Sequence, residues 1–173
     1  MRHRHPHQGY ALSQAGIILA LFLAVQGCGF QMRGSQSLTT AHISSLGLRS
    51  TTAEDLAREV KSQLQLAGVA VNTGADYTLS LENENYDRAV LSISPRTGKA
   101  EEFQLTLTAR ISLARADGSD LISHELISVS HDYLFDEDAL LGKASEENVL
   151  KANLRRQAAA DIIRRVHAKT KAN

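Results

Sequence analysis

The residues with the best spacing for catalysis are a histidine and an aspartate near residue 130. His131 and Asp132 follow closely on Ser128 and Ser130, so a serine, a base and an orienting carboxylate all occur nearby. A hydrolase needs these groups to converge, and its nucleophilic serine commonly stands in a Gly-x-Ser-x-Gly turn. That motif does not occur in this chain. We therefore predict that the protein is not an enzyme.

Metal chemistry has equally few candidate ligands. The other histidines beyond the first 40 residues are His42, His124 and His167, and none has His-x-x-His or Glu-x-x-His spacing. The chain has a single cysteine, which excludes an intrachain disulfide and a metal site built from several cysteines. We expect no metal and no cofactor, and a fold that is held together by packing.

The single cysteine, Cys28, has the surroundings of a lipid attachment site. It follows the small residue Gly27, close behind an uncharged apolar run from Ala15 to Val25 that a short basic leader precedes. The run is too short for a membrane helix, which needs roughly 20 apolar residues, but it suits the core of a signal peptide. The run Val25-Gln26-Gly27-Cys28 resembles a bacterial lipobox, whose cysteine takes a diacylglycerol on sulfur, and an acyl chain on its new amine after cleavage.

Residues 1–27 are therefore predicted to be a cleaved signal peptide, with Cys28 as the first residue of the mature chain. A triacylated cysteine would be a firm anchor, because two or more acyl chains bind a membrane stably whereas one binds it only marginally. The alternative is an unmodified, buried cysteine near an uncleaved N-terminus. It leaves the basic leader, the length of the apolar run and the small residue unexplained.

A second candidate for binding chemistry is the turn sequence Pro95 to Lys99. It places two cations, Arg96 and Lys99, at the tip of a loop between two long predicted strands. Such a loop can bind a phosphate by charge-assisted hydrogen bonds, which a guanidinium makes in pairs. The alternative is that these are ordinary solvated loop charges, as in most proteins.

The composition excludes other classes of partner. Without the first 27 residues, 17 basic residues face 19 acidic ones, so the mature chain has a formal net charge of minus two. A nucleic-acid-binding protein normally has a basic stripe with interleaved aromatic residues, and neither is present. The 146 remaining residues suffice for one domain with one core.

The periodicity of the apolar residues predicts two helices. Leu56, Val60 and Leu64 recur every fourth residue behind Thr51 and Glu54, which have capping-box spacing, and Gly68 suits a C-terminal cap. The last helix opens near Ser145-Glu146-Glu147, followed by apolar residues at every fourth position: Leu150, Leu154, Ala158, Ile162 and Val166. Its arginines, Arg155, Arg156, Arg164 and Arg165, are predicted to be solvated, and the tail from Ala168 to be frayed.

Alternation with a period of two predicts the strands. The clearest strand covers residues 103–113, with apolar residues on one face and hydroxyls, an amide and Arg110 on the other. A turn at 116–119 folds residues 121–133 back against it. A short strand is predicted at 42–48, and one long or broken strand from Val69 to Ile93. The resulting fold class is α+β, with two amphipathic helices packed on one face of a mixed four-stranded sheet.

Three segments resemble the LptE family of lipopolysaccharide-assembly lipoproteins. The mature N-terminus begins Cys28-Gly29-Phe30-x-x-Arg33-Gly34. The central loop, Arg96-x-Gly98-Lys99-x-x-Glu102-Phe103-Gln104, is similar to the family's basic loop that leads into a Glu-aromatic-Gln strand. The segment Ala139 to Lys143 matches a family segment of small and aliphatic residues that ends in lysine.

This resemblance implies a function and its partners. A family member is expected to be lipid-anchored at Cys28 on the periplasmic side of the outer membrane, to plug and help assemble the LptD barrel, and to bind lipopolysaccharide during its delivery to the outer leaflet. Residues 28–173 would form one domain with a tether at 28–40, and Gly29 in place of aspartate suits sorting to the outer membrane. The implied lipopolysaccharide site contains Arg96, Lys99 and Lys143, provided that their loops lie at one end of the sheet.

A different class of function stays open at this point. A free-standing periplasmic lipoprotein could bind a small amphiphile in a pocket between the helices and the sheet. That reading predicts a large apolar cavity, whereas the LptE resemblance predicts a filled core and a large barrel partner. The polar face of the central strand suits water, and equally the hydrophilic lumen of a membrane barrel.

Overall fold

The computed structural model describes residues 43–134 and 143–172 of the chain. The chain divides into two units, residues 1–36 and 37–173, and all described residues belong to the second unit. Cys28 and the predicted tether lie outside the described residues. In the described part of the chain, no helix is both long enough and apolar enough to cross a membrane.

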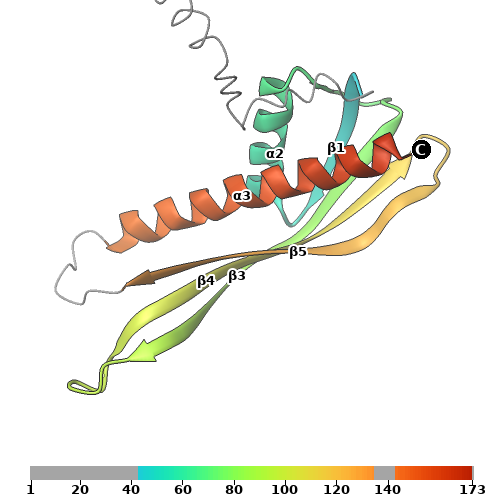
Figure 1. The fold of residues 1–173 in the computed structure, drawn as a ribbon. Helices are drawn as coiled ribbons and strands as arrows, with labels where there is room; N and C mark the ends of the chain where they lie inside the picture. The colour runs from blue at the N-terminus through green and yellow to red at the C-terminus, as the bar shows by residue number, and fades with distance from the viewer. Residues whose placement is uncertain (1–42, 135–142, 173) are drawn as a thin grey trace, which may run out of the picture. The chain divides into compact units, whose positions relative to one another are not determined.

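One mixed sheet of five strands forms the framework of the second unit (Figure 1). Along the sheet the order is β2 (Ala70–Val71), β1 (Ser45–Thr51), β3 (Tyr77–Ile93), β4 (Ala100–Arg115) and β5 (Asp120–Leu134). Strand β1 is parallel to both of its neighbours, and β3, β4 and β5 form an antiparallel meander. The parallel strands β1 and β2 are connected by a crossover that contains a helix, which is the usual connection between parallel strands.

The predicted number of four strands is wrong, because residues 69–93 are not one broken strand. Ala70–Val71 pairs with one edge of β1, and β3 pairs with the other edge, so the chain crosses β1 between them. A turn with Gly74 at a φ of +90° separates the two strands. The polar stretch from Glu82 to Arg88 does not interrupt β3, which continues through it with a bulge where Asn83 has a φ of +56°.

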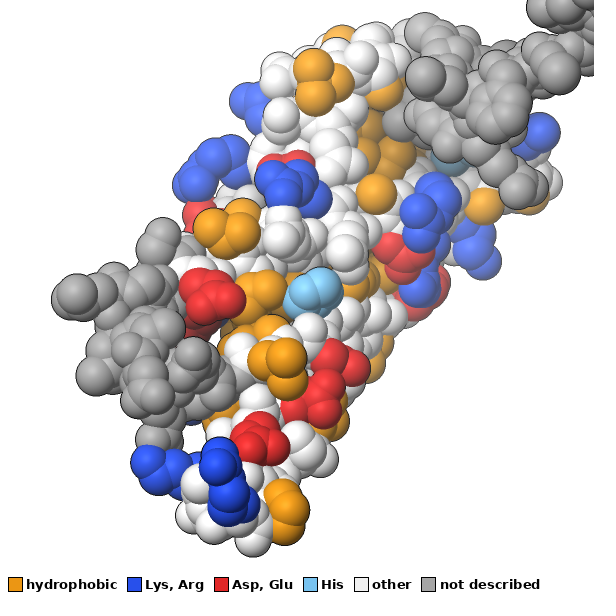
Figure 2. Space-filling model, turned by 60° about the vertical axis from the view of Figure 1, so that its left-hand side comes forward, with side chains coloured by type: hydrophobic (Ala, Val, Ile, Leu, Met, Phe, Trp, Pro, Cys, Tyr) orange, Lys and Arg blue, Asp and Glu red, His pale blue; other side chains and the backbone are white. Residues whose placement is uncertain are grey.

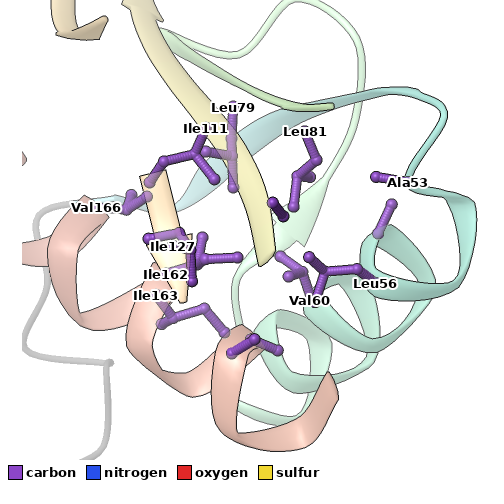
Figure 3. Packing of buried hydrophobic residues seen from close by; sticks show 14 of the residues in the cluster. Ala53, Leu56, Val60, Leu79, Leu81, Ile111, Ile127, Ile162, Ile163 and Val166 are labelled. Atoms are coloured by element: carbon purple, nitrogen blue, oxygen red, sulfur yellow. The ribbon is translucent and has the colours of Figure 1, made fainter. Parts of the chain in front are cut away.

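Both helices cover the same face of the sheet and pack beside each other, as predicted (Figure 1). Helix α2 (Glu54–Leu66) packs its apolar residues on β1, β2 and β3, and helix α3 (Lys143–Lys171) packs its apolar residues on β4 and β5. In Figure 3, Leu56, Val60 and Ile162 meet Leu81 and Ile127 in this layer. Each fully buried side chain of this kind contributes about 1.5–3 kcal/mol to stability.

The predicted capping box of α2 is not formed. The helix begins one residue after Ala53, which makes no side-chain cap, while Thr51 ends β1. The N–H of Leu56 instead donates to the carboxylate of Glu84, 3.0 Å away, in the bulge of β3. A strand residue therefore satisfies one of the orphan donors at the helix start. The C-terminal prediction is confirmed, because Gly68 follows the helix with a φ of +81°.

Helix α3 is longer than predicted at both ends. It begins at Lys143, ahead of Ser145, and continues to Lys171 without the predicted fraying at 168–171. The hydroxyl of Thr170 is buried and donates to the carbonyl of Val166, which ties the last turn down. All five apolar residues predicted to face the core are buried, namely Leu150, Leu154, Ala158, Ile162 and Val166.

The prediction that the arginines of α3 are solvated is wrong for two of them, which form ion pairs with other elements of the fold. Arg155 forms an ion pair with Asp55 of α2 at 2.9 Å, and its guanidinium lies 3.8 Å from Glu84. Arg165 pairs with Glu125 of β5 and with Asp161. These hydrogen-bonded carboxylates raise the pKa of Arg165, against the opposing effect of burial. The pairs link α3 to its neighbours, whereas Arg164 is exposed as predicted.

Candidate functional site

The predicted basic loop is a short, defined turn between β3 and β4. The N–H of Ser94 donates to the carbonyl of Lys99, and the N–H of Gly98 donates to the carbonyl of Ser94, both at 2.8 Å. Gly98 has a φ of +72°, a conformation that other residues rarely adopt. Because the turn is closed by its own backbone, Arg96 and Lys99 are held together at its exposed tip.

Apolar side chains surround this tip and are unusually exposed. On β3, Val90, Leu91 and Ile93 have exposed fractions of 51%, 45% and 62%. At the neighbouring end of β5, Leu134 is 77% exposed. Figure 2 shows blue Lys and Arg side chains at this end of the molecule with orange hydrophobic side chains near them. The end of the sheet therefore combines positive charge with exposed apolar surface.

A further cation, Arg88, lies on the helix-covered face of the same end. Its guanidinium carbon lies 4.9 Å from the ring centroid of Phe103, and Phe103 stacks on Tyr133 with centroids 5.9 Å apart. Arg88 was not singled out from the sequence, because it lies in the polar stretch between the two alternating parts of the predicted long or broken strand. Its position follows from the register, in which Arg88 lies opposite the buried Leu105 and so shares its face.

The third predicted residue, Lys143, is the first residue of α3, and its side chain lies outside the described part of the chain. The backbone places this helix start at the same end of the sheet as the β3–β4 turn (Figure 1). Strand β5 ends there as well, with Leu134 opposite Glu102, which follows Lys99 by three residues. The segments that carry Arg96, Lys99 and Lys143 thus share one end of the sheet.

Polar contacts join the first turns of α3 to β3. The ammonium of Lys151 lies 5.3 Å from the ring centroid of Tyr86 and 2.8 Å from the carboxylate of Glu147. The hydrogen bond from Lys151 lowers the pKa of Glu147. The hydroxyl of Tyr86 in turn donates to Glu84 at 2.8 Å. Burial, and next this hydrogen bond to a carboxylate, raise the pKa of Tyr86.

The candidate catalytic residues of β5 do not converge. Successive residues of a strand point to opposite faces, so His131 lies on the face of the buried Ile127, whereas Ser130 and Asp132 lie on the other face. Ser130 shares a hydrogen bond with Thr106, and Asp132 accepts one from Gln104. Within the described residues there is also no group of histidines, cysteines and carboxylates that could hold a metal ion.

The hollow between the helices and the sheet is small. Apolar side chains of both helices, β1 and the neighbouring loops line it: Ile43, Leu46, Leu64, Val69, Ile163 and Val166, with His167 beside them. Its cavity volume is about 20 Å³, which is room for about one water molecule. Pockets for drug-sized ligands range from about 300 to 1,000 Å³. This hollow falls below the large apolar cavity that the amphiphile-binding alternative predicts.

Comparison with known protein families gives a match over most of the chain. Residues 38–166 match the family model described as "LptE: Lipopolysaccharide-assembly". The chain belongs to the LptE family. This match spans both helices and all five strands except for the last turn of α3, so it includes the β3–β4 turn and the segment around Lys143.

Curated relatives carry the same family name. The LPS-assembly lipoprotein LptE of Photorhabdus laumondii is 31% identical over 149 residues, which cover 83% of this chain and 79% of the relative. The protein of the same name from Pectobacterium atrosepticum is 29% identical over 156 residues, covering 86% and 83%. LptE proteins are non-enzymatic components of lipopolysaccharide assembly that need no cofactor, in agreement with the predictions from the sequence.

Solved structures show the same fold. The rare lipoprotein B of Shewanella oneidensis superposes with a TM-score of 0.64 at 29% identity, covering 75% of this chain and 97% of that one. Lipoprotein B of Nitrosomonas europaea has a TM-score of 0.62 at 22% identity, covering 83% and 94%. The overall fold of the described part of this chain is therefore one that solved bacterial lipoproteins share.

Proposed function

We propose that this LptE-family protein is an outer-membrane lipoprotein that plugs and helps assemble an LptD-like barrel and binds lipopolysaccharide during its delivery to the outer leaflet. The observation that carries the proposal is the end of the sheet at the β3–β4 turn. Exposed cations and exposed apolar side chains lie together there, and neither group contributes to the core.

Lipopolysaccharide has a matching chemistry, since its lipid A carries phosphates and acyl chains. Arg96 and Lys99 would bind a phosphate by charge-assisted hydrogen bonds, with Lys143 as the third cation. The exposed Val90, Leu91 and Ile93 would contact acyl chains. Because the turn is fixed by its backbone hydrogen bonds, binding would cost little ordering of the loop.

The polar face of the sheet supports the contact with a barrel. It carries side chains that are hydrogen-bonded across strands, including Thr106 with Ser130 and Gln104 with Asp132. The lumen of an outer-membrane barrel is polar, so the hydroxyl, amide and charged side chains of this face suit it. Cys28 would carry an S-diacylglycerol and an N-acyl chain and anchor the protein to the outer membrane.

Binding and barrel contact can be tested separately. The double variant Arg96→Ala, Lys99→Ala should weaken lipopolysaccharide binding about tenfold or more, since each charge-assisted hydrogen bond contributes about 1.5–3 kcal/mol. Arg58→Ala is the matched control, because Arg58 is an exposed cation on α2, away from this end of the sheet. Equal binding by the double variant and the control would refute the loop site.

The barrel partner is tested by purification from membranes. Detergent extraction of the full-length, C-terminally tagged protein should recover a large barrel protein in stoichiometric amount. The double loop variant should recover it equally well, because the polar face of the sheet is unchanged. Recovery of the lipoprotein alone would contradict the plug and would favour a free-standing lipoprotein.

A further inference from the structure

We infer that β5 is a self-complementary edge, through which two copies of this chain pair antiparallel about a two-fold axis at Ser130. In the described part of the chain, β5 is the last strand of the sheet and pairs only with β4. Its second edge therefore presents backbone N–H and C=O groups that have no strand partner, the usual template for strand addition.

The second half of β5, from Leu126 to Leu134, lacks the features that usually prevent an edge strand from pairing with another chain. A bulge interrupts the register between residues 122 and 125, where His124 has a φ of +46°. From Leu126 to Leu134, however, the pairing with β4 is regular. This stretch contains no proline and no lysine, and its one formal charge is on Asp132. A regular edge of this length with a single charge favours pairing with another strand.

Two exposed leucines mark the ends of this regular stretch. Leu126 is 55% exposed and Leu134 is 77% exposed. Both lie on the polar face of the sheet, with Arg110 opposite Leu126 and Glu102 opposite Leu134 on β4. Neither leucine therefore has an apolar partner on β4. Packing in the core does not account for a leucine at either position.

The two leucines are equally far from Ser130, and this symmetry selects the register. An antiparallel pair centred on Ser130 puts Leu126 of each copy opposite Leu134 of the other, so all four leucines gain an apolar neighbour. It also puts Asp132 opposite Ser128, and so avoids facing like charges. On the helix-covered side, Ile127 meets Tyr133.

Other registers lose these matches. A centre one residue earlier puts Leu126 opposite Asp132, and a centre one residue later puts Leu126 beyond the end of the strand. In a two-fold pairing the same patch of each copy meets itself, so the two sheets would join into one continuous sheet. Neither lipopolysaccharide binding nor barrel contact enters this pairing, which concerns the protein outside the barrel.

Introduced thiols test the register directly. In the full chain with Cys28→Ser, Ser130→Cys places the two thiols opposite each other, within reach of a disulfide. Ser128→Cys is the matched control on the same face, because its two thiols would be separated by four residues along the strand, roughly 13 Å. On mild oxidation, position 130 should cross-link at least about ten times faster than position 128.

The leucines provide the second test. An interface of one strand pair is small, so sedimentation should show a weak dimer over a dilution series that reaches about 100 μM. Leu126→Lys and Leu134→Lys should each raise the dissociation constant about tenfold. Leu66→Lys is the control, because Leu66 is 86% exposed on α2, away from β5, and should leave it unchanged.

The inference fails if positions 128 and 130 cross-link equally, or if the protein stays monomeric over the whole series. It also fails if, in membranes, position 130 cross-links to a larger protein and not to a second copy. That last result would make β5 the docking edge for a partner of another kind. A failed dimer would leave the loop site untouched, since its test measures lipopolysaccharide binding alone.

Discussion

The two ends of β3 belong to one strand but lie in different surroundings. At its start, Leu79 and Leu81 are completely buried under the helices. At its end, residues 87–93 include no buried side chain, although three of them are large and apolar. A strand that needed only to fold could end where the helix cover ends. The exposed end of β3 is therefore best explained by binding, and the covered end by stability.

Truncating an apolar side chain should destabilise the protein more under the helices than at the exposed end of β3. Leu154→Ala removes a fully buried side chain of α3 and should lower the free energy of unfolding by about 2–5 kcal/mol. Val90→Ala, at the exposed end of β3, should change it by less than about 0.5 kcal/mol. Chemical denaturation of both variants measures the difference. Similar losses at the two sites would mean that the exposed end is part of the core.

The next largest effect should come from substituting Glu84, whose carboxylate links the bulge of β3 to the start of α2. Its side chain is only 8% exposed and accepts hydrogen bonds from the N–H of Leu56 and the hydroxyl of Tyr86. Glu84→Ala leaves both donors and the nearby Arg155 without this carboxylate, and should cost about 1–3 kcal/mol.

Glu82→Ala is the matched control for this substitution. Glu82 is two residues away on the opposite face, where its contact is a 3.9 Å pair with His124, and it is more exposed. Its loss should cost less than about 0.5 kcal/mol. If the two variants unfold at the same denaturant concentration, Glu84 does not hold the start of α2.

These sites also show what the sequence can predict. The alternation of residues 103–113 predicted β4 and its buried face correctly, because a one-sided environment imposes period two on every residue. Apolar residues at every fourth position identified the buried faces of both helices for the same reason. Such patterns are local, and the structure retains them.

The features that were missed depend on contacts between distant parts of the chain. The cap of α2 is supplied by Glu84, 28 residues away, so the local capping box at Thr51 and Glu54 was the wrong candidate. Strand β2 has only two residues, too few for any period. For the proposed site, the turn sequence alone predicted Arg96 and Lys99, whereas Arg88 is placed only by the register of β3 with β4.

A smaller effect with a defined pH dependence should come from Tyr86. Its pKa in the folded protein is raised above the ordinary value, mainly by burial, so the folded state retains the phenolic proton more strongly than the unfolded state. This contribution is fully present below about pH 10 and is lost as the pH rises above that value. Stability should therefore fall at alkaline pH.

Tyr86→Phe should cost about 1 kcal/mol at neutral pH, through the lost hydrogen bond, and should flatten the alkaline decline. Denaturation at pH 7 and above pH 10 measures both effects. Tyr133→Phe is the control, because Tyr133 contributes its ring to the stack on Phe103. An alkaline decline that is unchanged in Tyr86→Phe would assign the titration to another group.

The smallest effect on stability, and the sharpest contrast between stability and binding, should come from Arg88. Its contact with the ring of Phe103 is at the exposed end of β3, where a cation–π pair contributes about 0.5–1 kcal/mol. Arg88→Gln should therefore lower the free energy of unfolding by less than about 1 kcal/mol. If the hairpin of β3 and β4 binds an anionic amphiphile along its length, however, the same change should weaken lipopolysaccharide binding severalfold, because it removes a cation that lies six residues along β4 from Lys99. Unfolding and binding measured on one preparation decide the matter: a loss of stability without a loss of binding would make Arg88 part of the fold, and would confine the binding site to the turn itself.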